Sequence, residues 1–389
     1  MIGIKKFFRK YRQHLPLFVQ RKYFKCVTLK PNGVPKGRVL VSYAVTSAGL
    51  SDNNKLFNYH TGPWESNKIT SIFLELGYVV DVIHYNNKKF TPTEKYDVIF
   101  GVTGNLLRLV EETPGNPVVL FHPRTSSIKY NNKGEVNRIE NLKKRRGVSY
   151  KPKRQEPYED REEEILKVSD GVILIGNERT LSTYTKEFQS KIIRIPVSTS
   201  PLKYVKNKFV PKEREFMWHF GRGAVHKGLD LVLEVFAKHP EWKLNITGFI
   251  DREPDFMAIY KDELALPNIH FHGHLDPSSD CFIDIAKRSV AFIAPSVSES
   301  ISVACANMMK LGLFPIVSRD TGIDLPHGAG IYLEDCSIYE IEEAVASVFV
   351  MDKSELEDQI RRTQKVATNS YTRELFEEVM KDFIVKHLK

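Results

Sequence analysis

Residues 216–228 read Phe-Met-Trp-His-Phe-Gly-Arg-Gly-Ala-Val-His-Lys-Gly and give the clearest indication of the fold. The apolar run up to Phe220 predicts a buried strand, and the apolar spacing from Leu229 to Phe236 predicts a helix. Gly221-Arg222 and Lys227-Gly228 lie in the turn between them. Glycines let a backbone approach a phosphate closely, and a helix N-terminus offers free N–H groups to an anion. The stretch therefore predicts a phosphate-binding loop; the alternative is a surface loop with two solvated cations.

A second stretch, residues 290–318, repeats this strand–loop–helix order. Val290 to Ala294 is expected to be a strand, and the loop that follows it contains Glu299. Ligands of open parallel sheets bind at the C-terminal ends of the strands. We therefore expect Glu299 beside a binding crevice, where its carboxylate accepts hydrogen bonds from sugar hydroxyls.

Together the two stretches resemble the retaining GT-B glycosyltransferases of family four, the "group 1" glycosyltransferase family. In that family a Gly-Arg-x4-Lys-Gly loop holds the diphosphate of a sugar nucleotide. A Pro-Ser-x-x-Glu segment, with a second Glu eight residues later, holds the sugar and the ribose. The second Glu is replaced here by Asn307, which can still hydrogen-bond a hydroxyl but carries no charge. The donor-binding residues that the resemblance implies are Gly221, Arg222, Lys227, Gly228, Ser296, Glu299 and Asn307.

The resemblance implies an α/β fold with GT-B architecture, in which two Rossmann-like parallel-sheet domains face a cleft. Alternating strand and helix patterns on both sides of residues 198–213, an expected linker, agree with it. Residues 124–155 are polar and rich in Lys and Arg, and they predict a long mobile loop that is either a solvated surface or a clamp for an anionic acceptor. The expected divisions are a basic segment (1–36), an acceptor-side domain (37–200), a donor-nucleotide domain (201–368) and a terminal helix that crosses back to the first domain (369–389).

The expected chemistry is transfer of a sugar from a nucleotide-diphosphate sugar to an acceptor hydroxyl. His122, at the end of a predicted strand, and Glu299 are the catalytic candidates; a structural histidine is the alternative for His122. His60, Gly62 and Arg124 are expected on the acceptor side. The chain has no Asp-x-Asp pair to hold a metal ion against a diphosphate, so catalysis without a metal or other cofactor is expected.

Two rival functions stay open at this point. Asn307 and a first loop without the usual Gly-Gly favour a non-catalytic sugar-nucleotide-binding or partner subunit on the same fold. An epimerase or a phosphorylase on this fold is a weaker third interpretation. The four cysteines show no C-x-x-C pairing, so no disulfide or metal framework is expected, and a reducing cytoplasm is the expected location.

The net charge of +9 is concentrated at the N-terminus. Eleven of the 57 Lys and Arg residues precede Asp52, which is the first acidic residue. Ile4, Phe7, Phe8 and Tyr11 have helical spacing, which predicts a basic amphipathic helix that lies on an anionic membrane surface. A helix packed against the protein body is the alternative, and no nucleic-acid module follows the segment. The residues expected to contact the membrane are Lys5, Lys6, Phe7, Phe8, Arg9, Lys10 and Arg12.

We predict that the full chain binds vesicles containing anionic lipids at low salt, and that deletion of residues 1–25 abolishes this binding. Each cation near an anionic surface contributes about 1 kcal/mol, and the attraction fades within a Debye length. Sedimentation with vesicles at low and at high salt measures the effect, and neutral vesicles are the control. Sedimentation of the truncated chain with anionic vesicles would contradict the prediction.

Overall fold

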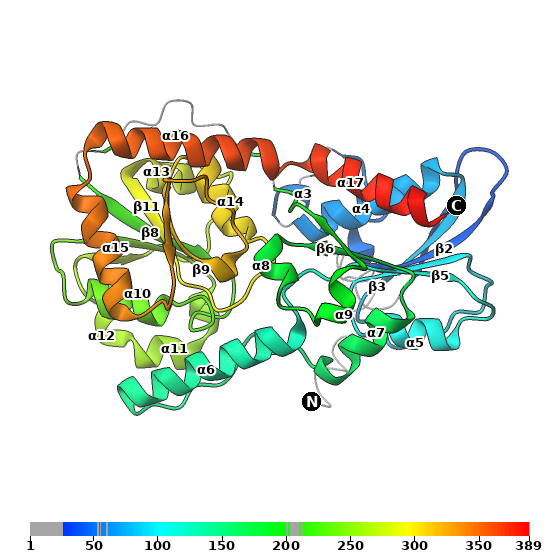
Figure 1. The fold of residues 1–389 in the computed structure, drawn as a ribbon, viewed down its shortest axis with the longest axis horizontal. Helices are drawn as coiled ribbons and strands as arrows, with labels where there is room; N and C mark the ends of the chain where they lie inside the picture. Colours follow the sequence, from blue (N-terminus) through cyan, green and yellow to red (C-terminus); the bar gives the residue numbers. More distant parts are fainter. Residues whose placement is uncertain are drawn as a thin grey trace, which may run out of the picture.

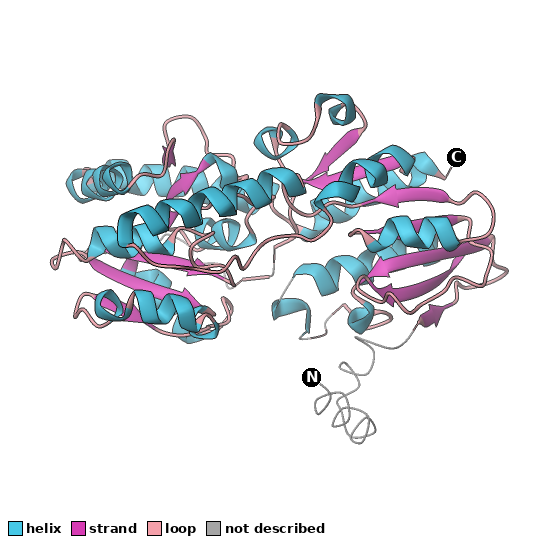
Figure 2. Cartoon of the chain, turned by 90° about the horizontal axis from the view of Figure 1, so that it is seen from below, coloured by secondary structure: helices cyan, strands magenta, loops and turns pink. Residues whose placement is uncertain are grey.

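The structure is a computed structural model that describes residues 26–388, except 53, 55, 60, 200, 203–209 and 212 and the side chains of 58 and 59. The predicted membrane segment, His60 and much of the expected linker lie outside the described residues. Two α/β domains lie side by side, each built around its own sheet (Figures 1 and 2). No helix among the described residues is long and apolar enough to cross a membrane.

The first domain contains a seven-stranded sheet in the order β1-β3-β2-β4-β5-β6-β7. Its strands are β1 (Val27–Leu29), β2 (Gly37–Tyr43), β3 (Tyr78–His84), β4 (Val98–Gly101), β5 (Val118–Phe121), β6 (Gly171–Ile175) and β7 (Ile192–Ile195). The short edge strand β1 is antiparallel to β3, and the other neighbours pair in parallel. The strand order reverses between β2 and β4, and such a switch point opens a crevice at the C-terminal ends of the strands.

The helices of the first domain connect these strands. They are η2 (Val45–Ser47), α3 (Leu56–Tyr59), α4 (Thr61–Glu75), α5 (Asn105–Glu112), α6 (Ile128–Arg146), η3 (Glu159–Arg161), α7 (Glu162–Val168), α8 (Glu178–Leu181) and α9 (Lys186–Gln189). The strands that connect through them are parallel because each helix returns the chain to the starting edge of the sheet.

The second domain contains a six-stranded parallel sheet in the order β10-β9-β8-β11-β12-β13. Its strands are β8 (Glu215–Phe220), β9 (Lys243–Gly248), β10 (Ile269–Phe271), β11 (Ser289–Ala294), β12 (Phe314–Ser318) and β13 (Ile331–Leu333). This is the Rossmann strand order, with its switch point between β8 and β11. The strands are buried on both faces, which explains their nearly continuous apolar sequences.

The helices of the second half cover this sheet and extend beyond it. They are α10 (Leu229–Phe236), η4 (Ile250–Arg252), α11 (Pro254–Ile259), α12 (Lys261–Leu264), α13 (Asp280–Arg288), α14 (Val303–Lys310), η5 (Arg319–Thr321), α15 (Ile338–Val350), α16 (Lys353–Ser370) and α17 (Arg373–His387). Helix α16 packs on α14 and β12, whereas α17 packs on α4, β6 and β7 of the first domain (Figure 1). The Phe376 ring meets Trp64 edge-on at 5.8 Å between centroids.

The expectation of a mobile loop over residues 124–155 is wrong, because residues 128–146 form α6, a helix of 19 residues. The helix escapes detection by apolar spacing because much of its buried surface is polar. Asn131, Asn132, Glu135 and Arg138 are all buried. The helix begins at the Ser127 cap, which accepts a hydrogen bond from Tyr130 N.

Helix α6 crosses from the first domain and lies along the second, below α11 and α12 in the view of Figure 1. The last two of its four consecutive cations face acidic residues of the second domain. Arg145 Nη2 donates to Asp230 Oδ2 at 2.6 Å and also pairs with Glu234, and Arg146 pairs with Glu263. Lys143 and Lys144 remain exposed. The basic run is therefore divided between interdomain ion pairs and a solvated surface.

We predict that Arg145→Ala lowers the free energy of unfolding by on the order of 3 kcal/mol, because it leaves the fully buried Asp230 without its ion-pair partner. Chemical unfolding followed by the fluorescence of Trp218 and Trp242 measures the loss. Lys144→Ala removes the exposed neighbour and should change stability by less than about 0.5 kcal/mol. Equal effects of the two substitutions would show that the ion pair between Arg145 and Asp230 adds nothing to the free energy of unfolding.

Candidate active site

The predicted phosphate-binding loop lies at the switch point of the second sheet. Residues 221–228 connect β8 to α10, and the loop from Pro295 to Ser302 leaves the neighbouring strand β11. The two loops meet in an ion pair between Lys227 Nζ and Glu299 Oε1. The tertiary structure thus joins the two sequence stretches from which the site was predicted, 72 residues apart.

Lys227 and Arg222 lie in different environments, although they belong to the same loop. Lys227 is 4 % exposed, and burial lowers its pKa while the Glu299 carboxylate raises it in part. Arg222 is exposed, and among the described residues its guanidinium makes no hydrogen bond or ion pair. The loop therefore offers one buried, paired cation and one solvated cation that is free to reach an anion.

At position 228 the backbone conformation and the close neighbours both require glycine. It has a φ of +74°, and a Cβ there would collide with Pro295 and come within 2.9 Å of Arg138 Nη1. The same arginine donates from Nη2 to the Pro295 carbonyl at 3.0 Å. The loop before α10, the loop after β11 and helix α6 of the first domain therefore pack tightly at one point.

Backbone amides of the loop 221–228 bind the carboxylate of Glu253, a residue that the sequence analysis did not identify. Gly223 N donates to Glu253 Oε1 at 2.5 Å, and Ala224 N donates to Glu253 Oε2 at 3.1 Å. Tyr150, which follows α6, donates its hydroxyl to Glu253 Oε2 at 2.6 Å. Since Glu253 is fully buried, these bonds fix the loop and tie it to the first domain.

Ser296 and Asn307 are buried beside this loop, with side-chain atoms left without partners. Ser296 Oγ and Asn307 Oδ1 make no hydrogen bond among the described residues. Asn307 lies on α14, whose first turn is capped by Ser302. Buried polar atoms of this kind usually have a partner, so both are available to a polar ligand.

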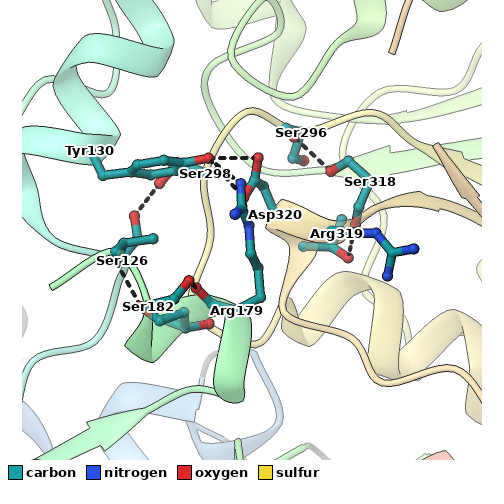
Figure 3. A network of polar contacts seen from close by, with 12 residues as sticks. Ser126, Tyr130, Arg179, Ser182, Ser296, Ser298, Ser318, Arg319 and Asp320 are labelled. Atoms are coloured by element: carbon teal, nitrogen blue, oxygen red, sulfur yellow. Dashed lines mark hydrogen bonds and ion pairs between the residues drawn. The ribbon is translucent and has the colours of Figure 1, made fainter. Parts of the chain in front are cut away.

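A polar bridge crosses from the first domain to the loops after β11 and β12 (Figure 3). Tyr130 donates its hydroxyl to Asp320 at 2.9 Å, and Arg179 Nε donates to the same carboxylate at 2.7 Å. Arg179 Nη2 also donates to the Tyr130 hydroxyl at 2.7 Å, and Ser126 hydrogen-bonds Ser298. Burial and the Asp320 charge raise the pKa of Tyr130 to about 12, so it remains a hydrogen-bond donor.

A cavity of about 720 Å³ lies at the switch point of the first sheet, at the C-terminal ends of β2, β3, β4 and β5. Gly62 and Arg124, two of the predicted acceptor-side residues, line it. Other lining residues are Tyr43, Tyr85, Asn86, Thr103, Arg154, Tyr158 and Glu162. The wall therefore combines aromatic rings with charged and hydrogen-bonding groups, a mixture suited to a polar ligand.

Arg124 is held by a buried network at the edge of this cavity. Its guanidinium lies 5.0 Å from the centroid of the Tyr43 ring, and Nε lies 3.7 Å from Glu65 Oε2. Glu65 is fully buried and accepts hydrogen bonds from the Tyr43 and Ser198 hydroxyls at 2.5 and 2.8 Å. Burial acts to raise the pKa of Glu65, but Arg124 and these hydroxyls lower it below its usual value. The carboxylate therefore fixes Arg124 as a cation.

His122 is not among the residues that line this cavity. Its ring is fully buried near Tyr43, Phe100 and Phe376, and Nδ1 lies 2.7 Å from the Ile173 carbonyl oxygen. Burial lowers the pKa of His122 to about 4, so the ring is neutral at pH 7. Nε2 has no partner among the described residues. A direct contact between His122 and a substrate stays a prediction.

Several groups that shape the site were missed in the sequence. Tyr130, Arg179, Asp320 and Glu253 carry no motif, because they come together only through interdomain contacts. Arg154 belongs to a basic run that was noticed, but its position beside the donor loop was not predicted. In the described part of the chain, no three His, Cys, Asp or Glu side chains are grouped closely enough to hold a metal ion.

Comparison with known proteins places this geometry in a fold class. The model of the family described as "Glycosyl transferases group 1" matches residues 203–366, which contain both loops of the predicted donor site. No curated protein matches the chain in sequence at a significant level.

Solved structures resemble the chain over both domains. Sucrose-phosphate synthase from Thermosynechococcus elongatus is 13% identical, with a TM-score of 0.63 over 92% of this chain and 99% of that one. WaaG, a glycosyltransferase involved in lipopolysaccharide biosynthesis, is 12% identical, with a TM-score of 0.55 over 89% and 99%. HepE from Anabaena, solved with UDP-glucose, is 10% identical, with a TM-score of 0.52 over 75% and 79%. The chain has the GT-B fold, which confirms the predicted fold class.

We predict that Glu162, a buried carboxyl in the cavity wall, makes stability depend on pH. Burial raises the pKa of Glu162 to about 7; the Ile128 amide opposes this shift, while Glu159 and Glu163 add to it. Because the folded state holds this proton more tightly than the unfolded chain, Glu162 lowers stability as the pH rises from about 4.5 to about 7. Relative to wild type, Glu162→Gln should gain on the order of 3 kcal/mol between pH 4 and pH 8.

Chemical unfolding of both proteins across this pH range measures the difference. Glu164→Gln, at an exposed position on the same helix, is the control and should follow the wild-type curve. A constant difference between Glu162→Gln and wild type at all pH values would contradict the raised pKa.

Proposed function

We propose that this chain is a glycosyltransferase that moves a sugar from a nucleotide-diphosphate sugar to an acceptor hydroxyl. The observation that carries the proposal is the meeting of Lys227 and Glu299 at the switch point of the second sheet, with the exposed Arg222 in the same loop as Lys227. Two cations and a hydroxyl-binding carboxylate are the groups that a diphosphate with an attached sugar requires. The family match to this domain and the neighbour solved with UDP-glucose support the same donor class.

The ion pair suggests an exchange of partners when the donor binds. A diphosphate brings oxygens that compete with Glu299 for Lys227, and Arg222 can add a two-pronged contact to the same group. Glu299, once released, can accept hydrogen bonds from sugar hydroxyls. Both cations then stabilise the negative charge that develops on the leaving diphosphate, without a metal ion. Ser296 and Asn307 supply further polar contacts to the donor.

The cavity in the first domain is the proposed acceptor site. Its place at the C-terminal ends of the strands, and its polar and aromatic wall, suit a glycan or a lipid-linked glycan. We infer retention of the anomeric configuration from the family resemblance, with the departing phosphate helping to remove the proton of the acceptor hydroxyl. The basic N-terminal segment supports a location on the inner face of a membrane.

The proposal is tested by comparing Arg222→Ala with wild type. Arg222 is exposed and pairs with no residue in the described part of the chain, so its removal should leave the fold intact. Loss of one preorganised contact to the diphosphate should lower kcat/KM for sugar transfer on the order of 100-fold. Donors are first screened as UDP, GDP, dTDP and ADP sugars by thermal shift, because a ligand that binds the folded state raises its stability. Lys238→Ala, an exposed cation after the far end of α10, is the control.

A second variant, Glu299→Gln, separates sugar binding from nucleotide binding. It removes the counter-charge of Lys227, so the free nucleoside diphosphate should bind at least as tightly as in wild type while turnover falls. Nucleotide binding without turnover in the wild type would favour the non-catalytic subunit. Full turnover in Arg222→Ala would remove the basis of the donor site.

A further inference from the structure

Arg154 lies where the cavity of the first domain reaches the donor loop of the second. It lines the 720 Å³ cavity together with Arg124, Tyr158 and Glu162. Its aliphatic stem lies against Gly223: a Cβ on that glycine would come within 2.6 Å of Arg154 Cγ and 3.1 Å of Cδ. Arg154 is therefore a residue of the first domain that borders both the cavity of that domain and the loop of residues 221–228 in the second.

Buried side chains of α6 hold the backbone at this position. Glu135, which is 1 % exposed, accepts hydrogen bonds from Lys153 N at 2.8 Å and from Arg154 N at 2.9 Å. Asn131 Nδ2 donates to the Arg154 carbonyl at 2.8 Å, and Asn132 bonds both backbone groups of Glu156. A segment fixed by this many buried bonds has a defined position, so Arg154 is not on a freely moving loop.

The guanidinium of Arg154 has no hydrogen bond or ion pair among the described residues. Its charge acts on the donor loop nevertheless: burial is the main cause that lowers the pKa of Lys227, and Arg154 lowers it further. Like charges at close range are unfavourable, and an anion between them relieves the repulsion. The nearby carboxylate of Glu299 is already paired with Lys227, and that of Glu253 is bound by amides and Tyr150. Glu156 lines the same cavity; burial raises the pKa of its carboxyl and the Arg154 charge opposes this shift, but the structure gives no ion pair between the two described side chains.

We infer that Arg154 binds a phosphoryl group at the boundary between the cavity and the donor loop. The planar guanidinium fits two phosphate oxygens at once, and the loop that carries Arg222 and Lys227 meets the Arg154 stem at Gly223. The phosphoryl group belongs either to the donor diphosphate or to an acceptor that carries a phosphate. The inference rests on the proposed function, and it makes the affinity for one substrate depend on a residue of each domain.

The experiment uses the full chain with Arg154→Gln, Arg154→Lys and the control Lys151→Gln, whose exposed cation lies three residues away and outside the cavity wall. In the first arm, calorimetric titration measures the Kd of the nucleoside diphosphate that wild type binds best among UDP, GDP, dTDP and ADP. In the second arm, inorganic phosphate is titrated into protein saturated with that nucleotide. Thermal unfolding verifies that the variants remain folded.

If Arg154 holds the donor, Arg154→Gln raises the Kd of the nucleotide about tenfold and leaves phosphate binding unchanged. If it holds an acceptor phosphate, the nucleotide Kd stays the same and phosphate binding is lost. Arg154→Lys should lie between wild type and Arg154→Gln, and Lys151→Gln should match wild type. Unchanged Kd values for both ligands in Arg154→Gln would overturn the inference.

Failure of the proposed function has a different signature. In that case wild type binds none of the four nucleotides, and phosphate is titrated into the free protein. If Arg154→Gln then loses phosphate binding and Lys151→Gln does not, the result supports a phosphoryl site at Arg154 that is not part of a donor site. No phosphate binding to wild type would overturn the inference as well.

Discussion

The arrangement of the two domains depends on polar contacts that α6 makes across the interface. The helix leaves the first sheet after β5 and brings Arg138 to the Pro295 carbonyl and Arg145 to the buried Asp230. Burial raises the pKa of Asp230, and the two arginines oppose this shift. A buried charge is tolerated only where such partners are fixed, so the ion pair selects one position of the helix. The position of α6 in turn contributes to the orientation of the two domains and to the site between them.

The same helix also organises both binding regions. Its polar side chains Asn131, Asn132 and Glu135 hold residues 153–156 against it. The next contacts, Tyr150 to Glu253 and Arg154 over Gly223, reach the loop that carries Arg222 and Lys227. The proposed donor and acceptor regions therefore share one structural support. A change in interdomain position would alter the wall of the cavity and the surroundings of the loop together.

The charged groups of the site are arranged so that an anionic ligand can replace a carboxylate as the partner of a cation. Lys227 is buried and paired with Glu299, whereas the guanidinium groups of Arg222 and Arg154 make no ion pair with any residue that the structure describes. In the cavity of the first domain, Arg124 is fixed by Glu65 and by the face of Tyr43, so its charge stays in place. A solvated cation such as Arg222 can follow a group that departs, and a fixed cation such as Arg124 suits a group that has to be oriented.

The sequence by itself determined the fold class and the two strand–loop–helix segments that form the proposed donor site. The apolar strands, the glycines beside Arg222 and Lys227, and the spacing to Glu299 are local patterns, and each arises from a short segment. The strand predicted over Val290 to Ala294 is found as β11 (Ser289–Ala294) for the same reason. Only the tertiary structure decided that residues 128–146 are a helix and that Arg154 borders the donor loop. Apolar periodicity cannot reveal a helix whose buried face is polar, because the groups that satisfy those side chains lie outside the helix, in residues 153–156 and at Pro295.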